Sequence, residues 1–152
     1  MTALRSLLLG FCVLPLLAAA DEELDAAFDK DILVIVAREH VCFRFEIHLA
    51  LNYEQQRRGL MFVRKLPPMS GMLFVYPDEA HRSMWMKNTY IPLDILFARR
   101  DGVVTNVVTN TVPLSLESIS STEPVTFVLE LNAGTTERLA IDAGSRLIWE
   151  TD

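Results

Sequence analysis

The clearest pattern in the chain is an alternation of apolar and polar positions between residues 41 and 51. One side of the alternation is apolar throughout: Val41, Phe43, Phe45, Ile47, Leu49 and Leu51. The other side is mostly polar: Cys42, Arg44, Glu46, His48 and Ala50. A period of two residues with one polar face predicts a half-buried strand and favours antiparallel pairing.

Further apolar runs predict the other strands. They cover residues 32–37, 71–76, 83–88, 93–98, 103–109, 125–131 and 146–150, the last with Leu147 and Trp149 facing inward. The run at 71–76 is expected to stop at Pro77, which cannot donate a ladder hydrogen bond. Residues 99–102 predict a hairpin turn that ends in glycine. Residues 110–124, rich in Ser, Thr and Pro, predict a loop or a weak edge strand.

Two short helices complete the prediction. Asn52 and Gln55 are spaced as a capping-box pair at the start of residues 53–58, and Gly59 follows as a C-cap. Residues 135–141 predict one or two helical turns. About seven short strands with one or two short helices favour a mainly β, single small domain of sandwich or barrel-like form.

The first twenty residues have the pattern of a cleavable secretory signal peptide. Arg5 precedes an apolar run, Ala18-Ala19-Ala20 supplies small residues, and Asp21 begins an acidic stretch. The apolar run is shorter than the about 20 residues that span a membrane. The alternatives are an uncleaved N-terminal anchor and a lipoprotein modified at Cys12.

The expected organisation follows from that leader. Residues 1–20 form the signal peptide, residues 21–39 form a lead-in that includes a short strand, and residues 40–152 form the β-rich domain. Cleavage near Ala20 predicts a periplasmic or secreted protein without a membrane span. The chain contains 51% hydrophobic residues, enough for a core, and its formal net charge of -6 makes nucleic acid and anionic membrane surfaces unexpected partners.

Cysteine content limits the redox chemistry. Cys12 leaves with the signal peptide, so Cys42 is the remaining thiol and cannot form an internal disulfide. We expect Cys42 to be shielded by the fold, because a free thiol is a hazard in an oxidising compartment. A reactive thiol is the alternative, although no neighbouring cation in the sequence would activate it.

Five blocks carry a resemblance to a known family. They are Arg58-Gly59-Leu60-Met61, Gly71-Met72-Leu73-Phe74, Trp85-Met86-Lys87-Asn88-Thr89, Ile91-Pro92-Leu93-Asp94-Ile95-Leu96-Phe97 and Val128-Leu129-Glu130-Leu131-Asn132-Ala133-Gly134. With these five resemblance blocks the chain resembles, from about residue 40 to 150, the bacterial and archaeal family called domain of unknown function 192. The resemblance implies a compact, mostly β, sandwich-like domain that is often exported, and it implies no established activity. Many relatives carry cysteine between the hairpin and the last long strand, where residues 113–118 have none, so no thiol role carries over.

The most unusual constellation surrounds Trp85. Charged and amide residues here interrupt otherwise apolar strands, and together with residues nearby they form one candidate ligand-binding patch: Trp85, Lys87, Asn88, Asp94, Glu130 and Arg57. Such a set contains acid, base and hydrogen-bond donor groups. The structural alternative is that Lys87 pairs with Asp94 or Glu130, that Asn88 caps a turn and that Trp85 fills the core.

Other chemistry has weaker support. Five methionines and one histidine could bind Cu(I), although methionine also fills irregular cores: Met61, Met69, Met72, Met84, Met86 and His81. The histidines lack zinc-ligand spacing, and His48 is expected to be a solvated or hydrogen-bonded surface residue. No phosphate loop, nucleophile elbow or dinucleotide turn is present, so no cofactor and no metal are expected.

The sequence therefore predicts a binding or accessory domain of the cell envelope, with a polar small molecule or an envelope protein as its partner. An enzyme is the alternative from another class. It would be hydrolase-like or lyase-like, with Asp94 or Glu130 as base and Lys87 as electrostatic stabiliser. A partner-binding module is the third hypothesis, and it predicts a large exposed apolar patch.

Overall fold

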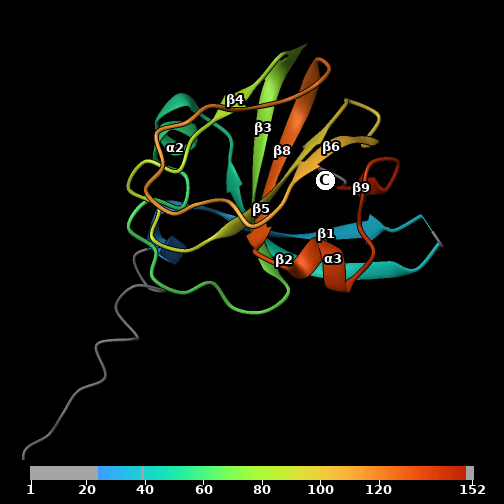
Figure 1. Ribbon diagram of the computed structural model, residues 1–152, viewed down its shortest axis with the longest axis horizontal. Helices are drawn as coiled ribbons and strands as arrows, with labels where there is room; N and C mark the ends of the chain where they lie inside the picture. The colour runs from blue at the N-terminus through green and yellow to red at the C-terminus, as the bar shows by residue number, and fades with distance from the viewer. Residues whose placement is uncertain (1–23, 39, 150–152) are drawn as a thin grey trace, which may run out of the picture.

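A curled seven-stranded sheet dominates the computed structural model, which describes residues 24–38 and 40–149 (Figure 1). The strand order is β6-β5-β8-β3-β2-β1-β9. The strands are β1 (Lys30–Val36), β2 (Cys42–Ala50), β3 (Ser70–Ala80), β5 (Leu93–Ala98), β6 (Val104–Val108), β8 (Val125–Asn132) and β9 (Arg146–Ile148). The predicted signal peptide lies outside the described residues. Among those described, no helix is long and apolar enough to cross a membrane.

The smaller elements lie around this sheet. β4 (Ser83–Met84) and β7 (Ile119–Ser120) pair as a separate small sheet. The helices are α2 (Tyr53–Arg58), α3 (Thr135–Arg138) and a single turn at residues 24–27. The mainly β fold class is confirmed.

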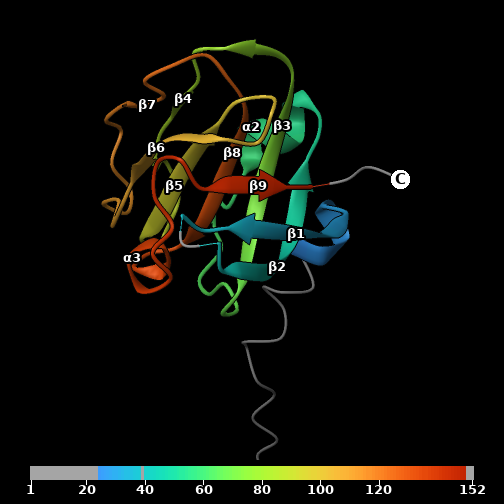
Figure 2. The same cartoon turned by 90° about the vertical axis from the view of Figure 1, so that its right-hand side faces the viewer.

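The curl brings the two edges of the sheet together as a half-barrel. In Figure 2, β9 lies between β1 and the start of β6. Val103 forms an isolated bridge with Arg146, which joins the β5–β6 hairpin to β9. All sheet neighbours are antiparallel except β2 and β3, which are parallel. Their connection carries α2, as a parallel pair requires a crossover.

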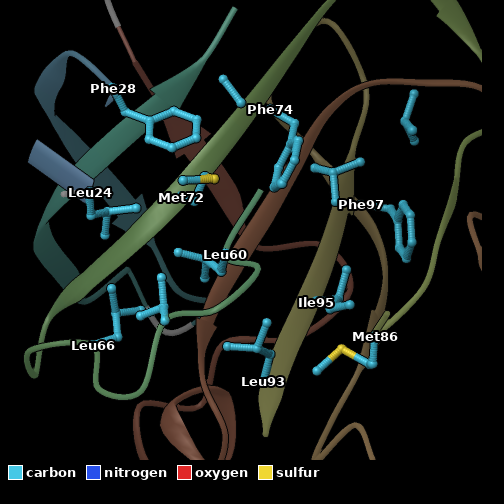
Figure 3. Close-up of a cluster of buried hydrophobic side chains, with 14 residues drawn as sticks. Leu24, Phe28, Leu60, Leu66, Met72, Phe74, Met86, Leu93, Ile95 and Phe97 are labelled. Atoms are coloured by element: carbon cyan, nitrogen blue, oxygen red, sulfur yellow. The ribbon is translucent and has the colours of Figure 1, made fainter. Parts of the chain in front are cut away.

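Around β5, β8 and the first half of β3 the sheet is buried on both faces, so alternate residues of these strands belong to two separate cores. On β3, Met72 and Phe74 contribute to one core and Leu73 to the other. The first core, shown in Figure 3, lies between the sheet and the loops that cover it. There the N-terminal turn supplies Phe28 and the loop after α2 supplies Leu60. The second core lies inside the curl.

The local capping signals are confirmed. The Gln55 amide donates to Asn52 Oδ1 at 3.0 Å, and the Gln55 side chain accepts from the Leu51 amide at 2.9 Å. Gly59 ends α2 with φ 49°, in the left-handed region that favours glycine. The predicted hairpin joins β5 and β6, and Gly102 has φ 81°.

Two strand predictions are corrected. β3 continues past Pro77 to Ala80, because a register irregularity between Val75 and Ala80 accommodates the proline. The strand predicted at 83–88 is limited to Ser83–Met84. After Met84 the chain leaves the strand and forms a turn. The Met86 amide donates to the Ser115 carbonyl at 3.0 Å and not to a neighbouring strand. The inward placement of Leu147 and Trp149 is confirmed, since Leu147 is buried in a hydrophobic core and the partly buried Trp149 packs against the same core.

His48 was expected to be a solvated or hydrogen-bonded surface residue. It is hydrogen-bonded, but it is only 4% exposed and so does not lie at the surface. The N-terminal helical turn covers this end of the strand, and His48 Nε2 lies 2.9 Å from Asp25 Oδ1. A local pattern of polar residues identifies the face of a strand but not the segment that packs over it.

Cys42 is exposed, so the expectation that the fold shields it is wrong. It lies on the same outward face of β2 as Arg44 and Glu46, where the two-residue alternation places it. We predict that a maleimide reagent labels Cys42 in the native protein, as peptide mass spectrometry would show. Labelling that requires denaturant would contradict the exposed position, and Cys42→Ser is the control.

Candidate functional site

A cavity of about 120 Å³ lies between α2, β3 and the segment that contains β4. We call it the Glu130 pocket. Its lining comes from α2 and the turn after it, from Phe74 and Tyr76 of β3, from residues 83–85 and Thr89, and from Glu130 of β8. Four of the five resemblance blocks meet here, because Arg58 to Met61, Phe74, Trp85 with Thr89, and Glu130 all line the pocket. The parts of the sequence that identify the family thus converge on one cavity.

Glu130 is the buried acid of this pocket. In the sheet it pairs with Met72 of β3 and Ile95 of β5, both of which are fully buried. Glu130 itself is 5% exposed, and its Oε2 atom has no hydrogen-bond partner among the described residues. Burial raises the pKa of Glu130 to about 8. At neutral pH the carboxyl group is therefore protonated, and it can both donate and accept a hydrogen bond.

Asp94 lies on the opposite face of the same sheet. β5 places Asp94 beside Leu131 and Ile95 beside Glu130, and successive side chains of a strand point to opposite faces. The Asp94 carboxylate is fully buried and accepts four hydrogen bonds. Their donors are the amides of Asn110, Gly134 and Thr136 and the Thr136 hydroxyl, at 2.7–3.2 Å. Through these hydrogen bonds Asp94 links β5 to two loops, and it lies apart from the Glu130 pocket.

Trp85 and Lys87 form a pair at the surface. The structural alternative placed Trp85 in the core, but its side chain is 47% exposed at the edge of the pocket. Lys87 Nζ lies 4.9 Å from the centre of the Trp85 ring. Among the described residues, Lys87 forms no ion pair with Asp94 or Glu130. The predicted charge pair is therefore replaced by a cation–π contact.

Asn88 and Arg57 occupy supporting positions. Asn88 has φ 56°, and its Nδ2 donates to Met61 Sδ at 3.8 Å, so it stabilises the turn between Trp85 and the next strand. Arg57 lines the pocket from α2, but its guanidinium is held by Glu54 Oε2 at 2.9 Å. That ion pair raises the pKa of Arg57. Of the predicted patch, Trp85, Glu130 and Arg57 meet at one cavity, whereas Lys87, Asn88 and Asp94 are absent from its lining.

Sequence reasoning missed Tyr76 and Arg82. The Tyr76 hydroxyl lies 3.9 Å from Met84 Sδ, and the Arg82 guanidinium lies 4.0 Å from the centre of the Tyr76 ring. Burial raises the pKa of Tyr76, an effect that the charge of Arg82 opposes. Tyr76 follows Met72 and Phe74 at two-residue spacing, so its place on this face of β3 could have been predicted. Arg82 lies in a loop, and no periodicity indicates its position.

Methionines near the pocket serve packing. Met72 and Met86 are fully buried in the first core, so their thioethers are not open to a soluble cation. The Met84 thioether sulfur accepts the hydrogen bond of the Tyr76 hydroxyl at 3.9 Å. Within residues 24–38 and 40–149, no group of three or more His, Cys, Asp or Glu side chains could hold a metal ion.

Next to the pocket, three loops expose apolar side chains. We call this the loop surface, and its residues are Phe62, Trp85, Tyr90, Val112, Leu114 and Leu116, each 39–69% exposed. Backbone hydrogen bonds join the loops, from the Phe62 amide to Asn88 at 2.8 Å and from the Leu114 amide to Thr89 at 3.1 Å. Phe62 and Leu114 have φ of 68° and 63°, a costly conformation for bulky residues. The loops are therefore held together in a defined shape.

Comparison with known proteins gave a family and several similar solved structures, two of which are described here. The family model DUF192, "Uncharacterized ACR, COG1430", matches residues 34–149. A Sinorhizobium meliloti protein described as a "putative transcription regulator" is 40% identical, with a TM-score of 0.78 over 80% of this chain and 94% of that one. A Novosphingobium aromaticivorans protein of unknown function is 32% identical, with a TM-score of 0.76 over 79% of this chain and 85% of that one.

No curated protein matched the chain. The matched span agrees with the region of about residues 40 to 150 that the sequence blocks indicated. Since the family model covers most of the chain and both structures share its fold, the protein belongs to the DUF192 family.

Proposed function

We propose that the protein is a ligand-binding domain of the cell envelope, and that its ligand is a small neutral polar molecule held in the Glu130 pocket. One observation carries the proposal. A carboxyl group that is protonated at neutral pH faces a cavity, and its Oε2 atom lacks a partner in the described part of the chain. Leaving a buried polar group unpaired costs about 1–3 kcal/mol, so a ligand that pairs with it recovers that free energy.

The lining limits the chemistry of the ligand. A neutral carboxyl group recognises a hydroxyl or an amide, to which it can donate and from which it can accept. The Tyr76 hydroxyl and Thr89 add polar groups, and Trp85 adds a half-exposed apolar surface at the edge. The volume of about 120 Å³ favours a small molecule or one unit of a larger one.

Binding explains the site better than catalysis does. The enzyme hypothesis required Asp94 or Glu130 as base and Lys87 as electrostatic stabiliser at one substrate. Asp94 lies on the other face of the sheet, and Lys87 is stacked on Trp85 outside the pocket lining. Among the described residues that line the pocket, Glu130 is accompanied by Tyr76 and two arginines but by no second carboxylate and no histidine, so the usual acid–base pair of hydrolysis or elimination is not formed there.

The compartment follows from the leader sequence. Residues 1–20 have the pattern of a cleavable signal peptide, which supports export to the periplasm or beyond. The description "putative transcription regulator" applies to the Sinorhizobium meliloti protein and is not carried over to this chain. The formal net charge of -6 in the present chain opposes binding to phosphate backbones.

A thermal-shift screen of the exported protein with neutral hydroxyl and amide compounds tests the ligand-binding proposal. We expect compounds that stabilise the wild-type protein to bind about tenfold more weakly to Glu130→Ala, because one buried hydrogen bond is lost. Asp142→Ala changes an exposed carboxylate distant in sequence and serves as the matched control. Binding should also weaken above pH 8, where Glu130 ionises. Stabilising compounds that bind equally to Glu130→Ala would contradict the proposal.

The loop surface favours a second candidate, in which an envelope protein with a complementary apolar face is the partner. Exposed apolar patches of this kind mark protein interaction sites. A photoreactive amino acid in place of Leu116, used in intact cells, tests this candidate. We expect a discrete adduct with another protein, and Leu114→Ser should reduce it. The candidate fails if no adduct forms or if Leu114→Ser leaves its yield unchanged.

A further inference from the structure

A second cavity lies where the β5–β6 hairpin meets β9, and its volume is about 320 Å³. We call it the β9 cavity. It shares no lining residue with the Glu130 pocket, and Leu33, Leu73 and Leu147 in its lining belong to the core inside the curl. We propose that the β9 cavity binds a small amphipathic organic anion, with a carboxylate at the rim and an apolar chain inside.

The interior of the β9 cavity suits an apolar chain. Leu33 of β1 and Leu73 of β3 are fully buried, and Leu147 is 6% exposed. Phe127 and Trp149 meet edge to face, with their ring centres 6.3 Å apart. Trp149 Nε1 donates to Asp31 Oδ2 at 2.7 Å, which fixes the orientation of the ring. The walls are therefore formed before a ligand arrives, and this reduces the entropy lost on binding.

The rim of the cavity, where the β5–β6 hairpin meets β9, also has a fixed geometry. Gly102 has φ 81°, and a Cβ atom at this position would lie 2.2 Å from the Leu147 carbonyl oxygen. The absence of a side chain lets the hairpin approach β9, where the Leu147 amide donates to the Gly102 carbonyl at 2.8 Å. This contact holds Arg100 of the hairpin and Arg146 of β9 on the lining of one cavity.

The charge at the rim selects an anion. Within the described residues, neither Arg100 nor Arg146 has a carboxylate within ion-pair distance, although the Arg100 guanidinium donates to the Pro77 carbonyl at 3.4 Å and the charge of Arg146 contributes to the lowered pKa of Asp101. Asp101 also lines the cavity, but its carboxylate already accepts from Arg99 and from the Val103 amide. Two guanidinium groups without carboxylate partners beside an apolar cavity form a ready site for a ligand carboxylate.

The volume sets the size of the ligand. Small-molecule sites commonly enclose about 300–1,000 Å³, and the β9 cavity lies at the lower end of that range. A medium-chain fatty carboxylate combines a single anionic group with an apolar body of suitable size. Octanoate is therefore a suitable probe, and 1-octanol and octylamine are its neutral and cationic counterparts.

Tryptophan fluorescence reports on this cavity selectively. The chain contains 2 tryptophans, so in a Trp85→Phe background Trp149 is the remaining one. We expect octanoate to change Trp149 emission saturably, with an affinity at least about tenfold higher than that of 1-octanol, as one charge-assisted contact would give. Octylamine should bind more weakly than 1-octanol.

Substitutions at the rim distinguish a specific site from general hydrophobic binding. Arg146→Gln and Arg100→Gln should each lower octanoate affinity by about tenfold and leave 1-octanol binding unchanged. Glu130→Gln, which alters only the other cavity, should leave octanoate binding unchanged. The proposal is overturned if octanoate does not bind, if both arginine variants bind it as the parent does, or if 1-octanol binds equally well.

Discussion

The wild-type protein is expected to lose up to about 5 kcal/mol of folding stability as pH rises from about 5 to about 8, and Glu130→Gln is expected to keep that stability. The pKa of Glu130 rises from an ordinary 4.5 to about 8 because the carboxyl group is buried without a partner. Between these values the native state holds a proton that the unfolded chain releases. Folding stability therefore falls as pH rises through this window.

The direction of its pKa shift distinguishes Glu130 from Asp25, Asp78 and Asp101. Ion pairs and hydrogen bonds lower the pKa values of Asp25, Asp78 and Asp101 below the ordinary 3.8. Their contribution is present at neutral pH and is lost only as pH falls below about 4. Glu130 contributes the opposite slope, at higher pH, because its native state favours the neutral form.

Urea unfolding at several pH values measures the Glu130 effect. Wild type and Glu130→Gln should have similar free energies of unfolding at pH 4.5, since glutamine resembles the protonated acid in shape and charge. At pH 9 the variant should be more stable by a few kcal/mol. The control Glu117→Gln changes an exposed carboxylate and should follow the wild type at each pH. Parallel pH profiles for wild type and Glu130→Gln would contradict the assignment.

Asp94→Ala is expected to destabilise the domain by about 3–5 kcal/mol, a large share of the stability of a domain of this size. The substitution leaves the amides of Asn110, Gly134 and Thr136 without their buried acceptor. It also frees the Thr136 hydroxyl, which donates to Asp94 at 2.7 Å. The physical cause is therefore the loss of a buried acceptor for the two buried donors of Thr136 and for two part-buried amides, together with a cavity at the end of β5.

The midpoint of urea unfolding measures the Asp94 effect, and Asp142→Ala is the matched control. Asp142 forms an exposed ion pair with Arg38 at 3.4 Å, so its loss should cost less than about 1 kcal/mol. A folded Asp94→Ala domain with wild-type stability would show that the four hydrogen bonds contribute little. The hypothesis that the Asp94 carboxylate acts in ligand binding or catalysis would then need to be tested again.

The fold was predictable wherever a strand carries its own periodicity. The alternation along β2 placed Phe45 and Ile47 in the core and Arg44 on the outer face, as the structure shows. The same alternation placed Cys42 outside, and the expectation of shielding failed because it relied on the chemistry of the thiol alone. Local pattern was the better guide at this position.

The candidate site was predictable in part because its residues depend on register. Asp94 and Glu130 were both identified, yet a one-residue offset between β5 and β8 places them on opposite faces of the sheet. Register depends on pairing across 30 or more residues of chain, which composition does not encode. Trp85 illustrates a similar limit, since a hydrogen bond between Met86 and distant Ser115 ends the predicted strand.

The state of one carboxyl group tests the account most directly. The ¹³Cδ resonance of Glu130, assigned by its loss in Glu130→Gln, can be followed by NMR from pH 3 to pH 10 in the native protein. A midpoint near 8 is the predicted result, because the side chain is buried beside the pocket without a partner. A midpoint near the ordinary 4.5 would mean that Glu130 is ionised at neutral pH, and the proposed recognition of a neutral ligand would then be wrong.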